Sequence, residues 1–300
     1  MVNTGNALVG RTVSGKRSVL EKSLNWNLYM NKVSKVFTRL VHITLFILIL
    51  SKASFAETIA IRAGKNDFPA TYMKSDNWEG MDIEIIREIF LRAKLDYRII
   101  NMPFKRSLLQ TQGGKIHLIP NLVKNKERSV YMHWLGPIRT TCIGLVVQKK
   151  DRDLSIKTTD DLVKVSHQEN KKVGYLTGAS YSALFDDRLE NDSSLQEVLH
   201  FLPDTHQHLE MLKLGRILGY FHDVFEIRQR MLDQSFAQQY SGLALHSYQI
   251  EGSCTGAYIG ISRKLDNISY IKIKTSFDAM KDDGTYARIY MKWIGTKPRL

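Results

Sequence analysis

Two groups of residues in this 300-residue chain have types and spacings that could form a metal site or a catalytic nucleophile. His206 and His208, with His200 nearby, could hold a metal ion, but side chains two positions apart on a helix point to different sides. We therefore expect a solvated helix start there. Ser180 and Ser182 do not belong to the Gly-x-Ser-x-Gly pattern of a nucleophile elbow. The sequence thus predicts no catalytic residue, no metal and no cofactor.

The formal charge of +13 is unevenly distributed. Residues 1–56 contain eight basic side chains and one acid and supply +7, so the rest of the chain carries a mild excess of +6. Nucleic-acid binding requires a basic stripe or a recognisable motif, and neither is present. A hydrophobic content of 43% is enough for a buried core, so we expect a folded protein with no nucleic-acid partner.

Residues 30–56 have the layout of a secretory signal peptide. A cationic stretch over 30–39 precedes the apolar run 43–50, and small residues at Ser54 and Ala56 suit cleavage after Ala56. The run is too short to span a bilayer as a mature helix, although an uncleaved anchor and a buried core helix are the alternatives. Residues 1–29 are an uncertain extension, and translation starting at Met30 would remove them. We expect a periplasmic protein.

Strands and helices alternate after residue 57, which favours an α/β fold. Strands are expected over residues 58–64, 96–102 and 115–120. A helix with Asp82 as N-cap is expected over 83–91, and another over 105–112 that stops at Gly113-Gly114. The pattern restarts with strands over 142–148, 172–176, 217–221 and 257–262, and with helices from 158, 181, 205 and 269.

Five motifs make this chain similar to a known family. They are Gly80-Met81-Asp82; Lys126-Glu127-Arg128 with Trp134-Leu135-Gly136-Pro137; Lys172-Val173-Gly174 before Gly178-Ala179-Ser180; Gly215-Arg216 before His222-Asp223; and the closing segment 283–295. In this order they resemble the family 3 extracellular solute-binding proteins, the polar amino-acid receptors of ABC importers. The resemblance covers residues 58–295.

The resemblance implies a type II periplasmic binding protein. Its two α/β lobes, each a mostly parallel sheet flanked by helices, are joined by two hinge strands, with the ligand in the cleft between them. Lobe 1 would contain residues 57–145 and 255–300, and lobe 2 residues 146–254. The hinge strands would place Cys142 and Cys254 close together, and an oxidising compartment would allow a disulfide; two separate thiols remain the alternative.

The family's charged ligand-binding positions match two residues here. Arg128 corresponds to the arginine that binds the ligand carboxylate, for which a planar guanidinium fork is suited. Asp223 corresponds to the carboxylate that binds the ligand ammonium. An alternative role for Asp223 is the N-cap of a following helix.

Other residues of the implied site contribute surfaces and backbone donors. Ala179 and Ser180 belong to the loop whose N–H groups would hold the ligand carboxylate, and Phe68 and Phe104 would cover the ligand side chain. One departure from the family is Pro120-Asn121, which replaces a small polar loop, removes a backbone donor and offers the Asn121 amide instead. This change bears on ligand class more than on fold.

The predicted function is therefore capture of a small polar solute, an amino acid, by a monomeric receptor that docks on the membrane permease of an ABC importer. One alternative is a ligand-sensing module for a membrane signalling partner. Another is an enzyme similar to cyclohexadienyl dehydratase, which would need an acid or base such as Glu79, His117 or His222 in the cleft.

Overall fold

The structure is a computed structural model that describes residues 29–42, 58–296 and 298. The chain divides into two compact units, Met1–Ala56 and Glu57–Leu300, which are described separately. In the first unit, residues 29–42 form an exposed helix. The apolar run and the cleavage site of the predicted signal peptide lie outside the described residues. Among the described helices, none has the length and apolar character needed to cross a membrane.

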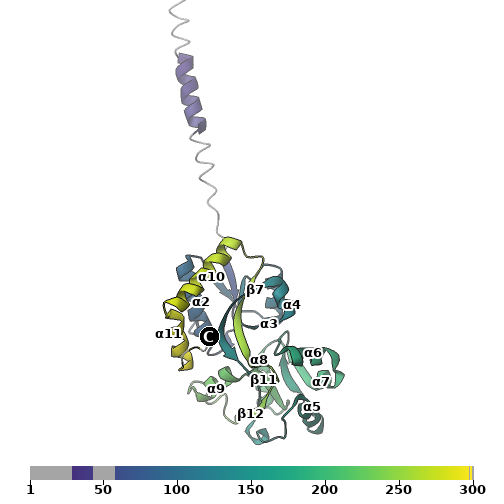
Figure 1. The fold of residues 1–300 in the computed structure, drawn as a ribbon. Helices are drawn as coiled ribbons and strands as arrows, with labels where there is room; N and C mark the ends of the chain where they lie inside the picture. Colours follow the sequence, from purple (N-terminus) through teal and green to yellow (C-terminus); the bar gives the residue numbers. More distant parts are fainter. Residues whose placement is uncertain (1–28, 43–57, 297, 299–300) are drawn as a thin grey trace, which may run out of the picture. The chain divides into compact units, whose positions relative to one another are not determined.

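The second unit contains two five-stranded sheets, each at the centre of one lobe (Figure 1). The first-lobe sheet has the order β5 (Tyr97–Ile100), β1 (Ile59–Arg62), β6 (Leu118–Val123), β13 (Thr255–Ser262) and β7 (Met132–Thr141). A small antiparallel sheet beside it contains β2 (Asn66–Asp67), β3 (Thr71–Lys74) and β4 (Asn77–Glu79). The helices of this lobe are α2 (Met81–Ala93), α3 (Phe104–Gln112), α4 (Lys126–Tyr131), α10 (Asn267–Asp282) and α11 (Thr285–Ile294).

The second-lobe sheet has the order β10 (Leu199–Leu202), β9 (Val173–Leu176), β11 (Gly219–Asp223), β8 (Ile143–Gln148) and β12 (Leu243–Gln249). Around it lie the 3-10 helix η1 (Lys149–Asp151) and the helices α5 (Thr159–Gln168), α6 (Ala183–Asn191), α7 (Ser193–Val198), α8 (Thr205–Lys213) and α9 (Val224–Leu232).

Helices cover the sheets because their apolar faces match the buried faces of the strands. In α2 an apolar stripe with Ile85, Ile86 and Ile89 is fully buried, and the helix packs against α10 and α11. Figure 1 shows these three helices together on one side of the first lobe. The second-lobe sheet has an apolar cluster on each face, one centred on Leu145 and Phe221 and the other on Val146 and Tyr220.

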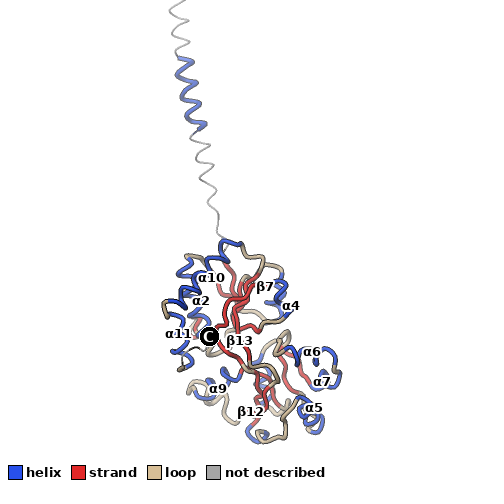
Figure 2. The backbone as a smooth tube through the Cα atoms, viewed as in Figure 1, coloured by secondary structure: helices blue, strands red, loops and turns tan. Residues whose placement is uncertain are grey.

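The two-lobed α/β class is confirmed, with mixed pairing in each sheet. Three strands pair in parallel (β5-β1-β6 and β10-β9-β11), and two more pair antiparallel at the side where the chain crosses between lobes. The crossings are β7 to β8 and β12 to β13, visible as long strands in Figure 2. A disulfide joins Cys142 to Cys254 between these crossings, with a Cα–Cα distance of 4.1 Å, as the resemblance implied.

The prediction that Asp82 caps α2 is wrong. The helix begins at Met81 after Gly80, and its first N–H groups donate to carbonyls of Pro69 and Ala70 instead of to a capping side chain. Gly80 has φ +123°, and a Cβ there would lie 2.3 Å from the Ala70 oxygen, so this motif position requires glycine. Asp82 is fully buried in the first turn instead.

Pro120 and Asn121 lie inside β6, which continues to Val123 and so extends past the end of the strand predicted over 115–120. They face a register shift in β13 between Tyr258 and Gly260, where ladder bonding is interrupted. Asn121 takes a left-handed backbone conformation with φ +58°, which asparagine tolerates well. The departure from the family motif is therefore a local bulge within a central strand. Strand β7 was not predicted because Gly136-Pro137, usually a turn signal, lies within it.

Candidate functional site

A cavity of about 320 Å³ lies between the two lobes. Its walls come from both sheets, from α3 and α4, and from the loops after β1, β5, β9 and β10. Six of the seven predicted ligand-binding residues line it: Phe104, Asn121, Arg128, Ala179, Ser180 and Asp223. The structure therefore brings together residues from most of the family-like motifs in one enclosure of the size that a small ligand needs.

Arg128 is a buried cation in this wall, with 3% of its surface exposed. Helix α4 positions it, because Asn125 caps the helix and accepts the Arg128 backbone N–H. The guanidinium donates to the Val123 carbonyl at 3.2 Å and across the cavity to the Gly178 carbonyl at 3.0 Å. Among the described residues it has no carboxylate partner, and burial lowers its pKa. Its positive charge is available to an anionic group.

Phe104 begins α3, and its ring contacts two guanidiniums. The Cζ of Arg128 is 5.7 Å from the centre of the ring, and the Cζ of Arg62 is 5.4 Å from it. Both arginines line the cavity. Such cation–π contacts orient the charged groups as well as stabilise them.

Asp223 lines the cavity, but its carboxylate is already fully used. One oxygen caps α9 by accepting from the N–H groups of Phe225 and Glu226. The other accepts from Arg139 at 2.7 Å and from Thr141 at 2.5 Å. Burial alone would raise the pKa of Asp223, but Arg139 and Thr141 keep it below its usual value. The N-cap alternative is confirmed, and the four acceptor positions of the carboxylate are filled without a ligand ammonium.

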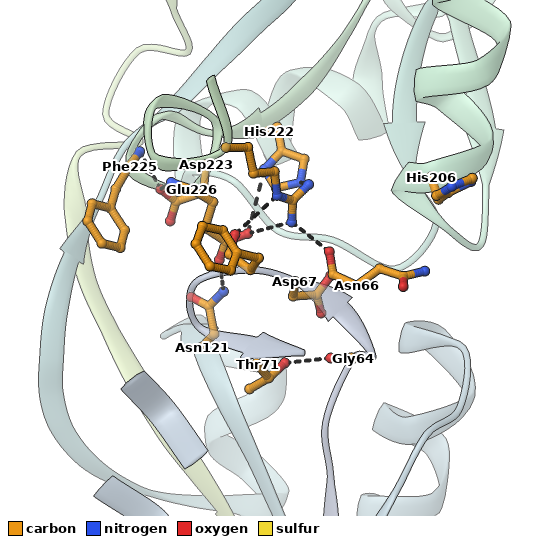
Figure 3. A network of polar contacts seen from close by, with 12 residues as sticks. Gly64, Asn66, Asp67, Thr71, Asn121, His206, His222, Asp223, Phe225 and Glu226 are labelled. Carbon is orange, nitrogen blue, oxygen red and sulfur yellow. Dashed lines mark hydrogen bonds and ion pairs between the residues drawn. The ribbon is translucent and has the colours of Figure 1, made fainter. Parts of the chain in front are cut away.

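Glu226 is a second buried carboxylate in the lining that sequence reasoning did not identify. Its Oε1 accepts from Arg139 at 2.9 Å and, across the cavity, from the Asn121 amide at 3.0 Å. Figure 3 shows Asn121 pointing from the first lobe toward Glu226. Burial raises the pKa of Glu226 well above its usual value. The Asn121 amide thus bridges the lobes instead of pointing freely into the cavity.

The loop of Ala179 and Ser180 also makes internal contacts. The Ala179 N–H donates to the Leu176 carbonyl at 2.9 Å, and the Ser180 hydroxyl donates to Asp186. Helix α6 starts only at Ala183, with Ser182 as its N-cap. Of the N–H donors expected in this loop, that of Ala179 is therefore occupied within the loop itself.

Phe68 does not line the cavity. Its ring packs against Tyr72 at 5.1 Å and Phe236 at 4.8 Å, in the wall of a neighbouring cavity of about 180 Å³. Its neighbours Asn66 and Asp67 face the site instead, opposite His222 and Glu226 (Figure 3). The ring is drawn away because it forms an aromatic cluster between the loop after β1 and the segment after α9.

Arg230 of α9 holds the same loop from the other lobe. Its guanidinium donates to the carbonyls of Asn66 at 2.7 Å and Phe68 at 3.1 Å. Tyr240 and His222 contact its remaining nitrogen. Arg230 thus joins the two lobes beside the cavity.

The residues suggested for an enzyme are only partly in the site. His222 lines the cavity, whereas Glu79 and His117 do not. Burial lowers the pKa of His222 to about 3, which makes it a weak base at neutral pH. No cluster of three or more metal-ligating side chains occurs within residues 29–42, 58–296 and 298. Of the histidines considered for a metal, His206 is exposed at the start of α8 but His208 is fully buried.

Sequence reasoning missed Arg62, Asp67, Arg139 and Glu226, all at or behind the cavity wall. Glu226 is three residues after Asp223, and a capped helix start would have predicted that they lie together. Arg62 lies in the strand predicted over 58–64 and ends β1, and side chains at the ends of strands commonly face a ligand crevice in α/β sheets. Arg139 carries no local signal, since it lies in the unpredicted strand β7.

Comparison with known proteins agrees with this architecture. The chain superimposes on ArtJ, the arginine-, lysine- and histidine-binding protein of Geobacillus stearothermophilus, with a TM-score of 0.65 and 14% identity over 81% of this chain and 98% of that one. A periplasmic binding protein of Salmonella typhimurium with high arginine specificity gives 0.62 and 18% over 79% and 99%.

A histidine kinase sensor domain similar to periplasmic binding proteins gives a TM-score of 0.63 and 13% identity over 81% and 98%. No curated protein matches the chain closely enough in sequence to count as a relative. The model of the bacterial extracellular solute-binding proteins, family 3, matches residues 59–296. The chain belongs to this family.

Proposed function

We propose that this protein is a periplasmic receptor that captures a small polar amino acid between its lobes and presents it to the permease of an ABC importer. The observation that carries the proposal is Arg128, a buried guanidinium in the cavity wall without a carboxylate partner among the described residues. An amino-acid carboxylate would supply the missing charge and fit the guanidinium fork. The solved structures of similar fold that bind arginine support the ligand class.

Export is part of the same proposal. Residues 30–56 would act as the signal peptide, and the Cys142–Cys254 disulfide is suited to an oxidising compartment. The two lobes would consist of residues 57–145 with 255–300 and of residues 146–254. Ligand binding would favour the form in which the lobes are joined, and a monomer in that form would dock on the permease. The alternative of a sensory module is not favoured by a particular feature of the cavity.

A thermal-shift screen of the exported protein against the twenty amino acids tests the proposal. At least one should raise the melting temperature, because a ligand that binds only the folded state stabilises it. The Arg128→Ala variant should lose that shift, whereas Arg228→Ala, which removes an exposed arginine of α9, should keep it. If Arg128→Ala binds the same amino acid as tightly as the original protein, the carboxylate role is refuted.

A further inference from the structure

Arg62, at the end of β1, is a cavity residue whose hydrogen-bonding capacity is unused. Its side chain is only 14% exposed, and its Nε is buried without a partner. None of its N–H groups meets a hydrogen-bond acceptor within the part of the chain that the structure describes. Its contacts are the ring of Phe104 and an ion pair with Asp67, whose Oδ2 is 3.8 Å from Nη1. A buried guanidinium without acceptors is costly unless a ligand provides them.

Asp67 is the corresponding unused acid. Its side chain is 30% exposed in the cavity wall, and among the described residues no donor hydrogen-bonds its carboxylate. Its place depends on Gly64, since a Cβ there would lie 1.7 Å from Asp67 Oδ2. Figure 3 shows Asp67 on the loop that faces the second lobe. The carboxylate is thus positioned at the cavity and remains free to accept hydrogen bonds from a bound cation.

The other charged groups of the lining are already engaged or balanced. Asp223 and Glu226 share Arg139, as described above, and Glu226 also forms an ion pair with Arg230, whose Nη2 lies 3.7 Å from Oε2. Lys65 is exposed, and the Asp204 carboxylate caps α8 by accepting the N–H of His206. The groups left for a ligand are therefore two guanidiniums, Arg62 and Arg128, both near the ring of Phe104, and one carboxylate, Asp67. Their combined charge is positive.

We infer that the ligand is an acidic amino acid, with one carboxylate on Arg128, the other on Arg62, and its ammonium on Asp67. This assignment rests on the proposed function and makes it more specific. Two carboxylates and one ammonium match the unused groups in number and sign, so that each buried charge is paired. A basic amino acid would place its second positive charge against Arg62. Asp67 takes the role that the family resemblance assigned to Asp223.

Calorimetric titration of the exported protein, unfolded and refolded to remove any bound solute, tests the ligand class directly. The probes are L-glutamate, L-aspartate, L-glutamine, L-asparagine and L-arginine. At least one acidic amino acid should bind about 10- to 100-fold more tightly than its amide, because the amide leaves Arg62 without an anion. Arginine should bind more weakly than the amides.

Variants test the subsite by the ratio of affinities for the acid and its amide. Arg62→Gln should reduce this ratio to about one, while Arg62→Lys should keep a preference for the acid because the charge remains. Arg98→Gln, at an exposed position of the neighbouring strand β5, is the matched control and should leave the ratio unchanged. Asp67→Asn should weaken the binding of both the acid and its amide, while the ratio of their affinities stays above one. A merely structural role would lower the melting temperature without moving the ratio.

The outcomes separate this inference from the proposed function. If the protein binds a neutral or basic amino acid more tightly than glutamate and aspartate, the inference fails and the proposed function stands. If it binds none of the twenty amino acids, both fail. If an acidic amino acid binds but Arg62→Gln preserves its preference over the amide, the assignment of Arg62 is overturned.

Discussion

Arg139 Nη1 lies 2.7 Å from Asp223 Oδ2, and the pair joins strand β7 of the first lobe to the end of β11 in the second. The Arg139 side chain is completely buried, and its Nη2 also contacts Glu226 at 2.9 Å. One guanidinium thus contacts two carboxylates at the base of the cavity, and Arg230, 3.7 Å from Glu226, supplies a second positive charge. This relationship explains why Asp223 caps a helix and braces the lobes instead of presenting a free charge to the ligand.

Replacing Arg139 with Met should destabilise the protein by about 3–5 kcal/mol, because removing one partner of a buried ion pair leaves the others unpaired. The free energy of unfolding in urea at pH 7 measures the loss. Arg98→Met at the exposed surface of β5 is the control and should cost less than about 0.5 kcal/mol. A loss below about 1 kcal/mol for Arg139→Met would show that the carboxylates find other partners.

Local pattern predicted those parts of the fold that local burial determines. The apolar run 143–147 is buried along its length in β8, and the stripe of α2 faces the core. The family resemblance, rather than local pattern, implied that Arg128 and Phe104 line the cavity, and they do. The signals for the strand and the helix are short in sequence, because local burial and capping determine such elements.

The contacts that decide the use of Asp223 could not be predicted in this way. Its partner Arg139 is 84 residues away, on a strand that contains Gly136-Pro137 and does not alternate clearly. Arg62 likewise has no sequence feature that distinguishes it from the exposed Arg98. It becomes buried only because Phe104 and the loop containing Asp67 pack over the end of β1. Long-range packing, rather than local propensity, determines these roles.

Asp82 should make stability depend on pH. Both of its carboxylate oxygens are buried without a hydrogen-bond partner among the described residues, and burial raises its pKa from 3.8 to about 6. Between these values the folded protein holds a proton that the unfolded chain has lost, so the contribution of Asp82 to stability falls as the pH rises from about 4 to about 6.

The Asp82→Asn variant should therefore be more stable than the original protein by about 2–3 kcal/mol at pH 7.5, and nearly equal to it at pH 4. Urea unfolding at several pH values gives the difference in free energy of unfolding between the two proteins. Other titrating groups, such as His222, are common to both proteins, so their contributions cancel in this difference. Asp96→Asn, at an exposed position, is the control and should change the free energy of unfolding by less than about 0.5 kcal/mol. A difference for Asp82→Asn that does not change with pH would contradict the raised pKa.

The Cys142–Cys254 disulfide should be a major source of stability. It links residues 112 positions apart in sequence, and closing a loop of that length stabilises the folded state by about 4–5 kcal/mol in the chain-entropy model. The variant with both cysteines replaced by Ser should lose much of this free energy in urea unfolding, and the original protein in reductant should lose a similar amount. A thiol titration of the unreduced, unfolded protein should find no free thiol; two free thiols would show that the bridge does not form.

Arg230 should control how readily the lobes remain joined. Its two hydrogen bonds to the carbonyls of Asn66 and Phe68 come from α9 of the opposite lobe, and a lysine cannot reproduce both from one fork. The Arg230→Lys variant should therefore populate a more open form, with a larger radius of gyration in small-angle X-ray scattering without ligand. Affinity for the bound amino acid should fall about 10-fold, because the binding-competent form becomes less populated.

Arg228→Lys on the same helix, at an exposed position, should change neither the radius of gyration nor the affinity. An unchanged radius of gyration in Arg230→Lys would mean that the remaining contacts across the cavity, Asn121 to Glu226 and Arg128 to Gly178, are sufficient to join the lobes.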